Sequence, residues 1–176
     1  MTMRKLIKTV VGVAGAALMA SCVVACNSSE TPETAETADA FRVHAIYNEN
    51  ANAAAQVQEA LAEAAREHKR VILDFGGNWC GDCQILDFYF HQQPNAGLLA
   101  ANYVLVDIDA GHLDRNTDIA DKYDVPLQRG VPALAVLDAE GHVIYSQTTG
   151  QFAAMGRVDP AQVTNFLEQW KGPAGG

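Results

Sequence analysis

The chain has 176 residues, of which 49% are apolar, and this is enough for one folded domain with short additional segments. Its formal net charge is −9, from 12 basic and 21 acidic residues, and it has no basic stripe with interleaved aromatic residues. Such a balance argues against nucleic acid and against anionic lipid surfaces as partners.

The first 26 residues have the layout of a secretory signal peptide. A short basic stretch, residues 1–8, precedes residues 9–26, which carry no charge and are rich in Ala, Gly and Val. Cys22 and Cys26 close this segment, and the residues before each resemble the lipobox after which bacterial lipoproteins are cut and acylated on cysteine. We predict lipid attachment at Cys26, with Cys22 as the alternative, because a polar linker begins directly after Cys26. An uncleaved anchor helix is the other interpretation of the uncharged stretch.

Residues 27–40 are small, polar and acidic, without aromatic side chains, and therefore predict a disordered tether. The tether precedes a predicted folded domain, residues 41–171, and residues 172–176 are predicted to form a flexible tail. This organisation predicts a lipid-anchored domain on the periplasmic side of a bacterial membrane. The outer membrane is preferred, because Asn27 after Cys26 is not the Asp that commonly retains lipoproteins in the inner membrane.

The folded domain begins with a predicted edge strand and a helix. Residues 41–47 alternate imperfectly between apolar and polar side chains, which favours an edge strand. Asn50 or Asn52 is expected to cap a helix over residues 53–69. The apolar residues of this segment recur at helical spacing, so the helix should face the core.

A buried strand then leads into the most informative stretch of the chain. Residues 71–75, Val-Ile-Leu-Asp-Phe, have the β-branched and aromatic content of a strand that is wholly or nearly buried. The breaker cluster Gly-Gly-Asn at residues 76–78 ends this strand. A helix is therefore expected to begin at about Cys80 and to end near Gln93, because Pro94 follows.

Cys80 and Cys83 lie three positions apart at the start of this helix. The thiolate is the reactive form of cysteine, and the unpaired N–H groups and partial positive charge of a helix N-terminus favour it. Cys80 is therefore predicted to be a nucleophile, and Cys83, one turn later, to resolve the mixed disulfide formed at Cys80. Two other interpretations are less consistent with this spacing. A zinc site needs two more ligands in a suitable pattern, and a purely structural bridge over so short a loop restrains the unfolded chain little.

The rest of the chain predicts further helices and strands. A helical turn should follow residues 94–95, and the last helix should begin at Asp159 and Pro160, with Pro at its first position. The other predicted elements, in chain order, are a second central strand over residues 103–108, a short helix over 114–123, a strand over 133–137, a hairpin turn over 138–141 and a returning strand over 142–148. No element is predicted for residues 151–157. Strand–helix alternation followed by a hairpin and a closing helix is an α/β layout.

Two motifs in this layout resemble those of the thioredoxin superfamily. In that superfamily a strand with an internal Asp leads into W-C-G-x-C, and a later Pro precedes an apolar strand. Both motifs occur here in the right order, within a resemblance that spans roughly residues 41–171; the matching residues are Asp74, Phe75, Trp79, Cys80, Gly81 and Cys83, followed by Gly130, Val131 and Pro132. The layout is closest to the periplasmic thioredoxin-like domain of the transmembrane thiol-reductase family.

The resemblance implies a single domain with the thioredoxin fold, an α/β structure in which helices flank a central mixed sheet. It also implies that Pro132 is cis and faces the disulfide, and that Val131 and Pro132 offer a backbone edge to an extended substrate chain. Trp79 is expected to cover the disulfide. In thioredoxin a lysine on the neighbouring strand accompanies the internal Asp, whereas the aligned position here is Leu105.

Acidic residues are predicted to tune the chemistry. Asp74 lies within an apolar strand, and because burial disfavours a carboxylate, its pKa should be raised toward the range useful for proton transfer. We predict Asp74 as the acid/base for Cys83; the alternative is an Asp that only forms hydrogen bonds in the core. Gly81 and Asp82 lie between the cysteines. The charge of Asp82 should oppose thiolate formation at Cys80, which favours a reductant.

Together these features predict a membrane-tethered, extracytoplasmic thiol–disulfide oxidoreductase that works in the reductase or isomerase direction. Its redox group is the Cys80–Cys83 pair, with no other cofactor, and its partners are exported proteins with thiols or disulfides and a membrane electron donor. No metal site is predicted, because the acidic loop over residues 107–114 does not follow a calcium-binding pattern. The alternative function is a thioredoxin-fold binding module without turnover, such as a chaperone or a copper-handling protein.

Overall fold

The computed structural model describes residues 43–172. The predicted signal peptide, the tether and the cysteines Cys22 and Cys26 lie outside the described residues, as does most of the predicted tail. Among residues 43–172, no helix is both long enough and apolar enough to cross a membrane.

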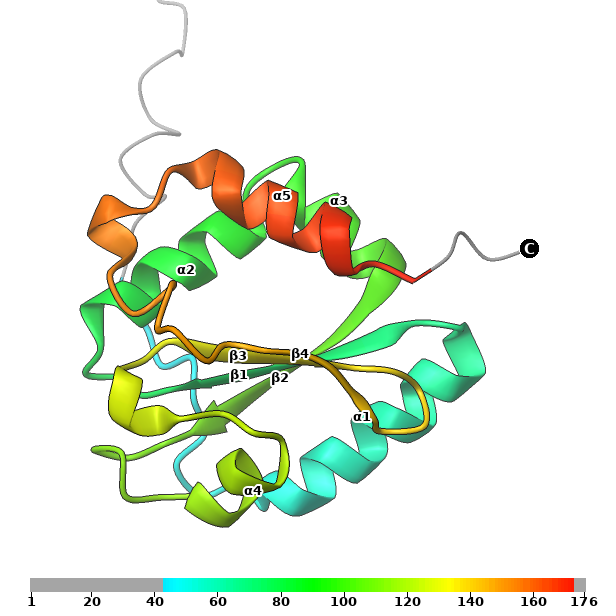
Figure 1. Ribbon diagram of the computed structural model, residues 1–176, viewed down its shortest axis with the longest axis horizontal. Coiled ribbons are helices and arrows are strands. Elements are labelled where there is room, and N and C mark those ends of the chain that lie inside the picture. Colours follow the sequence, from blue (N-terminus) through cyan, green and yellow to red (C-terminus); the bar gives the residue numbers. More distant parts are fainter. Residues whose placement is uncertain (1–42, 173–176) are drawn as a thin grey trace, which may run out of the picture. The chain divides into compact units, whose positions relative to one another are not determined.

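In the part of the chain that the structure describes, a four-stranded mixed sheet forms the centre of the domain (Figure 1). The strands lie in the order β2-β1-β3-β4, and their bounds are Arg70–Gly76 for β1, Tyr103–Asp109 for β2, Ala133–Leu137 for β3 and Val143–Ser146 for β4. Strand β1 runs parallel to β2 and antiparallel to β3, and β4 runs antiparallel to β3. A parallel pair needs a crossover connection, and the chain between β1 and β2 supplies it with two helices.

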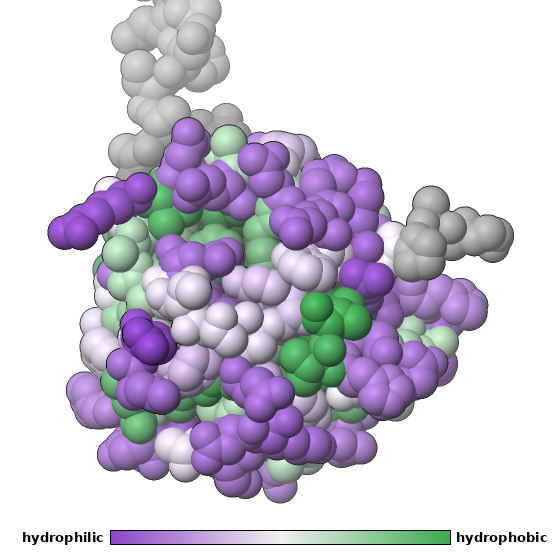
Figure 2. Space-filling model, in the orientation of Figure 1, coloured by the Kyte–Doolittle hydropathy of each residue, from purple (hydrophilic) through white to green (hydrophobic). Residues whose placement is uncertain are grey.

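Helices cover both faces of the sheet (Figure 1), which confirms the predicted α/β fold class. One face carries α1 (Ala53–Glu67) and α4 (Thr117–Lys122), and the other carries α2 (Gly81–His91), α3 (Asn95–Asn102) and α5 (Pro160–Trp170). Residues 43–172 also include two short 3-10 helices, η1 (Leu127–Arg129) and η2 (Met155–Arg157). The face of the molecule seen in Figure 2 is mostly hydrophilic, with smaller apolar areas between the polar side chains.

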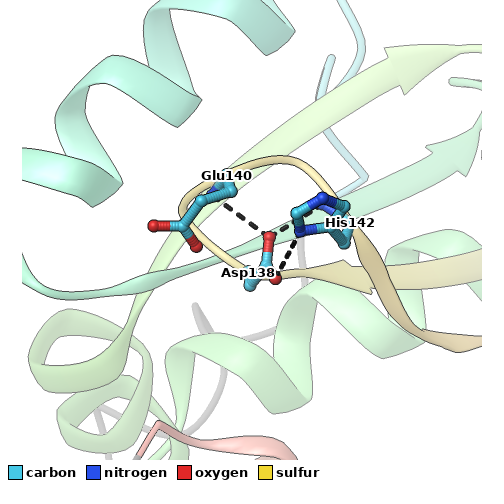
Figure 3. A group of neighbouring side chains, drawn as sticks. All are labelled: Asp138, Glu140 and His142. Carbon is cyan, nitrogen blue, oxygen red and sulfur yellow. Dashed lines mark hydrogen bonds and ion pairs between the residues drawn. The ribbon is translucent and has the colours of Figure 1, made fainter.

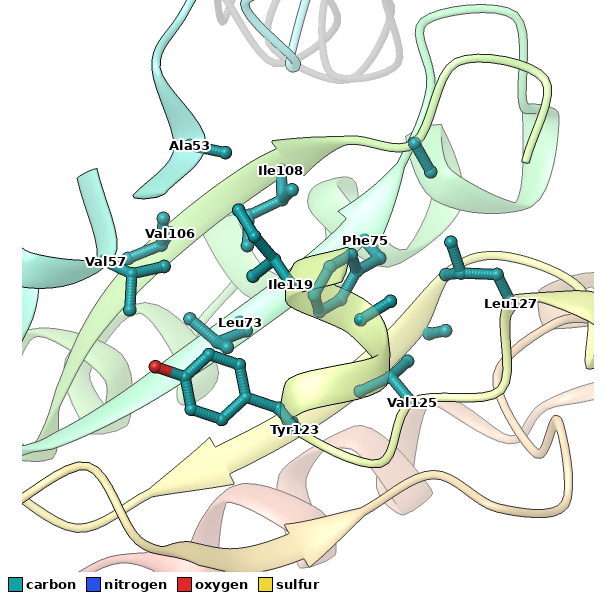
Figure 4. Packing of buried hydrophobic residues seen from close by; sticks show 14 of the residues in the cluster. Ala53, Val57, Leu73, Phe75, Val106, Ile108, Ile119, Tyr123, Val125 and Leu127 are labelled. Atoms are coloured by element: carbon teal, nitrogen blue, oxygen red, sulfur yellow. The ribbon is translucent and has the colours of Figure 1, made fainter. Parts of the chain in front are cut away.

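Strand β1 is buried between two hydrophobic clusters. Successive strand residues point to opposite faces of a sheet. Leu73 and Phe75 accordingly pack with residues of α1 and α4 (Figure 4), whereas Ile72 packs with residues of α2 and α5. By the same alternation Asp74 lies on the face of Ile72, so β1 places a carboxyl group in the core on the side of α2.

Residues 43–47 do not form a strand, which corrects the edge strand predicted there. The backbone N–H groups of Ile46 and Tyr47 donate to Asn78 Oδ1 at 2.9 and 3.0 Å, and Asn78 Nδ2 donates to the Tyr47 carbonyl oxygen at 2.9 Å. The peptide groups of Ile46 and Tyr47 are therefore bonded to a side chain of the β1–α2 turn instead of to a neighbouring strand. We call residues 43–47 the strap.

Strand β2 was predicted as a central strand, and it lies instead at one edge of the sheet formed by the described residues. It pairs with β1 in a register that sets Asp107 beside Asp74 and Leu105 beside Ile72. The helix predicted over residues 114–123 is also shorter, since α4 begins at Thr117. Asn116 before it adopts a left-handed backbone conformation with φ 51°, which a continuous helix does not allow.

The N-cap of α1 gives a direct test of this part of the fold. The Asn52 side chain accepts a hydrogen bond from the Ala55 N–H at 3.1 Å. Replacing Asn52 by Ala should lower the free energy of unfolding by about 1 kcal/mol, because that N–H loses its partner. The matched control is Asn50→Ala, which should change stability by at most about 0.5 kcal/mol. Urea unfolding followed by circular dichroism compares the two, and equal losses would contradict the cap.

Candidate active site

Cys80 and Cys83 form a disulfide at the N-terminus of α2, with an S–S distance of 2.25 Å. Cys80 is the N-cap residue, and its Sγ accepts a hydrogen bond from the Cys83 backbone N–H at 3.1 Å. Cys80 is 5% exposed, whereas Cys83 is fully buried. A partner sulfur can therefore reach Cys80 first, and the helix N-terminus favours a thiolate at that position.

The loop before β3 lies against this disulfide. The Val131–Pro132 peptide bond is cis, and Cys80 Sγ lies 3.6 Å from the Val131 carbonyl oxygen. The buried side chain of Gln147 holds this loop: its Nε2 donates to the Pro132 carbonyl at 3.0 Å, and its Oε1 accepts from the Leu134 N–H at 3.3 Å. Sequence reasoning missed Gln147, because a Gln within a returning strand carries no motif.

Trp79 precedes the disulfide and is 53% exposed. Its indole Nε1–H donates to the Gly111 carbonyl at 2.7 Å, and its ring stacks on the His112 ring with 5.0 Å between centroids. The indole is thus held by the loop that follows β2, at the rim of the site. A Cβ on Gly77 would lie 2.6 Å from Trp79 Nε1, so Gly77 leaves room for this orientation of the indole.

Residues 150–157, for most of which the sequence predicts no element, lie beside the disulfide. Asp82 Oδ1 accepts a hydrogen bond from the Gly156 N–H at 3.2 Å, which joins this segment to the start of α2. Its other side contacts the Pro132 loop, since a Cβ on Gly130 would lie 2.9 Å from the Ala153 Cβ. Phe152 and Met155 are buried in the cluster beneath α2 and α5. The segment therefore forms one wall of the site.

Asp74 lies beneath the cysteines in strand β1. It is 1% exposed, its Oδ2 accepts a hydrogen bond from the Tyr47 hydroxyl at 3.0 Å, and its Oδ1 has no partner among the described residues. Burial, followed by the negative charge of Asp107, raises the pKa of Asp74 well above its ordinary value. Burial likewise raises the pKa of Tyr47, so its hydroxyl stays protonated as a donor. Tyr47 was not among the predicted site residues.

Two further carboxyl groups lie near Asp74. Burial raises the pKa of Asp107 to about 6, and the charge of Asp87 adds to this shift. Asp87 lies on α2, with its Oδ2 3.3 Å from His44 Nε2 and its Oδ1 3.3 Å from His91 Nδ1. The neighbouring strand therefore presents a second carboxyl group beside Asp74, while Leu105 occupies the position at which the family resemblance places a lysine.

A group of possible metal ligands lies at the turn between β3 and β4 (Figure 3). Asp138, Glu140 and His142 offer ligand atoms within 4.8 Å of one another. Asp138 Oδ1 accepts from the Glu140 and His142 backbone N–H groups at 3.1 and 2.8 Å, and Oδ2 lies 2.9 Å from His142 Nδ1. These contacts close an exposed hairpin turn at the end of β3 opposite the Pro132 loop, and they account for the cluster without an ion.

The buried carboxyl groups predict that stability falls as the pH rises. The pKa of Asp74 and that of Asp107 are raised above the ordinary value of 3.8, so above that pH the folded chain holds more protons than the unfolded chain. The free energy of unfolding is then highest below the ordinary pKa and falls through the raised values. Asp107→Asn removes one of these carboxyl groups and also removes a charge that raises the pKa of the other, Asp74. The free energy of unfolding should therefore fall less between about pH 5 and about pH 8 than in the wild type, by roughly 1–3 kcal/mol.

Chemical unfolding at both pH values measures this slope. The matched control is Asp138→Asn: slight burial raises the pKa of Asp138, but hydrogen bonds from His142 outweigh this and lower it overall. The contribution of Asp138 to stability is lost only at more acidic pH. This variant should therefore keep the wild-type dependence of unfolding free energy on pH between these two values. A wild-type slope in the Asp107→Asn variant would show that Asp107 is not held protonated by the fold.

Comparisons with known proteins place this geometry in a family. A family described as thioredoxin-like matches residues 50–139. The crystal structure of a disulphide isomerase from Xylella fastidiosa Temecula1 is 36% identical with a TM-score of 0.68, and the match covers 73% of this chain and 98% of that chain. The solution structure of a thioredoxin from Thermus thermophilus is 22% identical with a TM-score of 0.48, and the match covers 64% of this chain and 81% of that chain. A search of curated proteins found no match.

The matched region contains both sequence motifs and three of the four strands that the described residues form. The crossover between two parallel strands, the disulfide at a helix N-terminus and the cis Pro132 agree with the fold that the sequence predicted. We conclude that the chain belongs to the thioredoxin superfamily and carries an oxidoreductase-type C-x-x-C disulfide.

Proposed function

We propose that this protein is a thiol–disulfide oxidoreductase that acts outside the cytoplasm on cysteines of exported proteins, in the reductase or isomerase direction. One observation carries the proposal. The Cys80–Cys83 disulfide lies at the N-terminus of α2, with Cys80 Sγ 3.6 Å from the Val131 carbonyl of the Pro132 loop. The 36% identity to a protein described as a disulphide isomerase supports the same class of chemistry.

In the reducing direction, the Cys80 thiolate attacks one sulfur of a substrate disulfide. A mixed disulfide forms and the first substrate thiolate leaves. Cys83 then gives its proton to Asp74 and attacks Cys80 Sγ, which closes the Cys80–Cys83 bond and releases the second substrate thiolate. A dithiol donor, which we assign to the membrane, must reduce the pair again. The two cysteine sulfurs carry both electrons, so this cycle needs no other cofactor.

The surroundings of the disulfide suit an extended peptide. The Val131 carbonyl and Pro132 offer a backbone edge of the kind to which an extended chain can pair. Trp79 is half exposed on the rim and offers apolar area to the substrate. The wall formed by residues 150–157 closes the other side. These groups are proposed to hold the substrate cysteine over Cys80.

The direction of the reaction depends on the thiolate of Cys80. Asp82 places a carboxylate in the first turn of α2, where its charge opposes that of the thiolate. Gly81 adds no side chain between Cys80 and Asp82, and a Cβ on Gly81 would have open space around it. Less thiolate stabilisation makes the dithiol a better reductant, so we assign the tuning of the couple to Gly81 and Asp82.

The enzyme proposal predicts both turnover and a low potential. The wild-type protein should reduce insulin with dithiothreitol, Cys80→Ser should abolish this activity, and Cys83→Ser should accumulate the mixed disulfide. Equilibration in dithiothreitol buffers should give a reduction potential of about −250 mV, close to the thioredoxin value. A reduction potential of about −120 mV would contradict the role given to Asp82. Stoichiometric copper(I) binding without insulin reduction would support the alternative, a binding module, instead.

We further propose that the chain is lipid-anchored through Cys26 to the periplasmic side of a bacterial membrane, with the outer membrane preferred and residues 27–40 as the tether. The sequence of the leader supports this proposal. Cys26→Ala should remove lipid labelling and release the protein from the membrane fraction, whereas Cys22→Ala should change neither. Release by Cys22→Ala alone would assign the lipid to Cys22, and full retention in the double variant would contradict a lipid anchor.

A further inference from the structure

We propose that Tyr47 relays the proton of the Cys83 thiol to Asp74, so that this tyrosine sets the rate at which the mixed disulfide is resolved. The inference rests on the proposed oxidoreductase function and deepens it. It assigns to the strap, outside both sequence motifs, a part in the second chemical step.

The Tyr47 hydroxyl lies near both the Asp74 carboxyl group and the Cys83 sulfur. It donates to Asp74 Oδ2 at 3.0 Å. A Cβ on Gly76 would collide with this same hydroxyl and would also lie 2.9 Å from Cys83 Sγ. The hydroxyl oxygen and the sulfur therefore both lie close to the position that a Cβ of residue 76 would occupy. Only glycine, which has no Cβ, leaves this position open.

The strap holds this hydroxyl in place. Tyr47 is 2% exposed, and its backbone N–H and carbonyl are both bonded to the Asn78 side chain. The Gln84 side chain of α2 bonds the backbone of His44 in the same way. Gln84 Oε1 accepts from the His44 N–H at 3.1 Å, and Gln84 Nε2 donates to the His44 carbonyl oxygen at 2.8 Å. The strap is thus fastened on one side to the turn before Cys80 and on the other to the helix that carries Cys83.

The proton transfer balances as follows. The Cys83 thiol gives its proton to the Tyr47 oxygen while Tyr47 gives its own proton to the Asp74 carboxylate. The products are a Cys83 thiolate, an unchanged tyrosine and a neutral Asp74. The thiolate then attacks Cys80 Sγ, and the substrate thiolate leaves with the electron pair of the broken S–S bond. Asp74 gives up the proton before the next cycle.

Several groups act on Asp74 and shape the pH dependence. Asp107 approaches from β2 and Asp87 from α2, with its neighbours His44 and His91, and Tyr47 approaches from the strap. Burial and the two carboxylates raise the pKa of Asp74, and the Tyr47 hydrogen bond lowers it. Removing the hydroxyl should therefore raise this pKa further, so that the Asp74 base forms only at higher pH.

The experiment follows the two steps separately by stopped flow. The reduced protein is mixed with dithiobis(nitrobenzoate), an aromatic disulfide whose thiolate product is coloured. Attack by Cys80 releases the first coloured thiolate, and resolution by Cys83 releases the second. Tyr47→Phe should leave the first phase unchanged, slow the second at least about tenfold at neutral pH, and move its pH midpoint upward.

The matched control is Tyr103→Phe, which removes another buried hydroxyl, bonded to the Leu167 carbonyl at 2.6 Å on the α5 side of the sheet. Both phases should keep their wild-type rates in this variant. Asp74→Asn should also slow the second phase, and adding Tyr47→Phe to it should slow that phase no further, because the two groups serve one proton. If Tyr47→Phe does not fold, Asn78→Ala, which unfastens the strap, should slow the second phase selectively.

A second phase at the wild-type rate and midpoint in Tyr47→Phe would overturn the relay, as would effects of Tyr47→Phe and Asp74→Asn that multiply. These results are distinct from failure of the proposed function. A wild-type protein that shows both phases but leaves protein disulfides intact would contradict the enzyme proposal, and the comparison of the two phases would still decide the role of Tyr47.

Discussion

Burial of strand β1 on both faces is the constraint on which the rest of the structure depends. The strand can be covered on both sides only if helices pack against each face, and the turn after Gly76 leads directly into one of them. That turn places Cys80 and Cys83 at the start of α2, above the strand end. The same strand carries Asp74 into the core beneath them. One packing requirement therefore sets the relative positions of the sulfurs and the carboxyl group.

The carboxyl groups around Asp74 link stability to chemistry. A buried ionised carboxylate without a cation is costly, and β2 presents Asp107 beside Asp74. The fold accommodates both because their pKa values rise and they are held protonated through much of the acidic range. A carboxyl group with a raised pKa is also one that can exchange a proton with a thiol. The raised pKa that costs folding free energy at higher pH is thus also the property that would suit Asp74 to the acid/base role proposed for it.

Two irregular segments decide the surroundings of the disulfide. The strap is fastened by the Asn78 side chain, and residues 150–157 are fastened by Asp82 and by buried Phe152 and Met155. The alternation in residues 41–47 is imperfect and residues 151–157 show no periodic pattern, so neither sequence predicts the position of its segment. Both are held by bonds between side chains and distant backbone groups, which depend on neighbours that the linear sequence does not identify. This is why an edge strand was predicted for the strap and nothing for most of the second segment.

The sequence by itself determined the elements whose signals are local. The apolar run of β1, a helix cap at Asn50 or Asn52, the Pro at the start of α5 and the spacing of the cysteines depend on residues a few positions apart. The structure has each of these features, with Asn52 as the cap. The tertiary structure alone decided that β2 lies at the edge of the sheet formed by the described residues and that Gln147 supports the Pro132 loop. It also decided that the Tyr47 hydroxyl bonds Asp74 and lies, like the Cys83 sulfur, beside Gly76. These features are contacts between residues far apart in the chain, and they exist only once the sheet and its helices have packed.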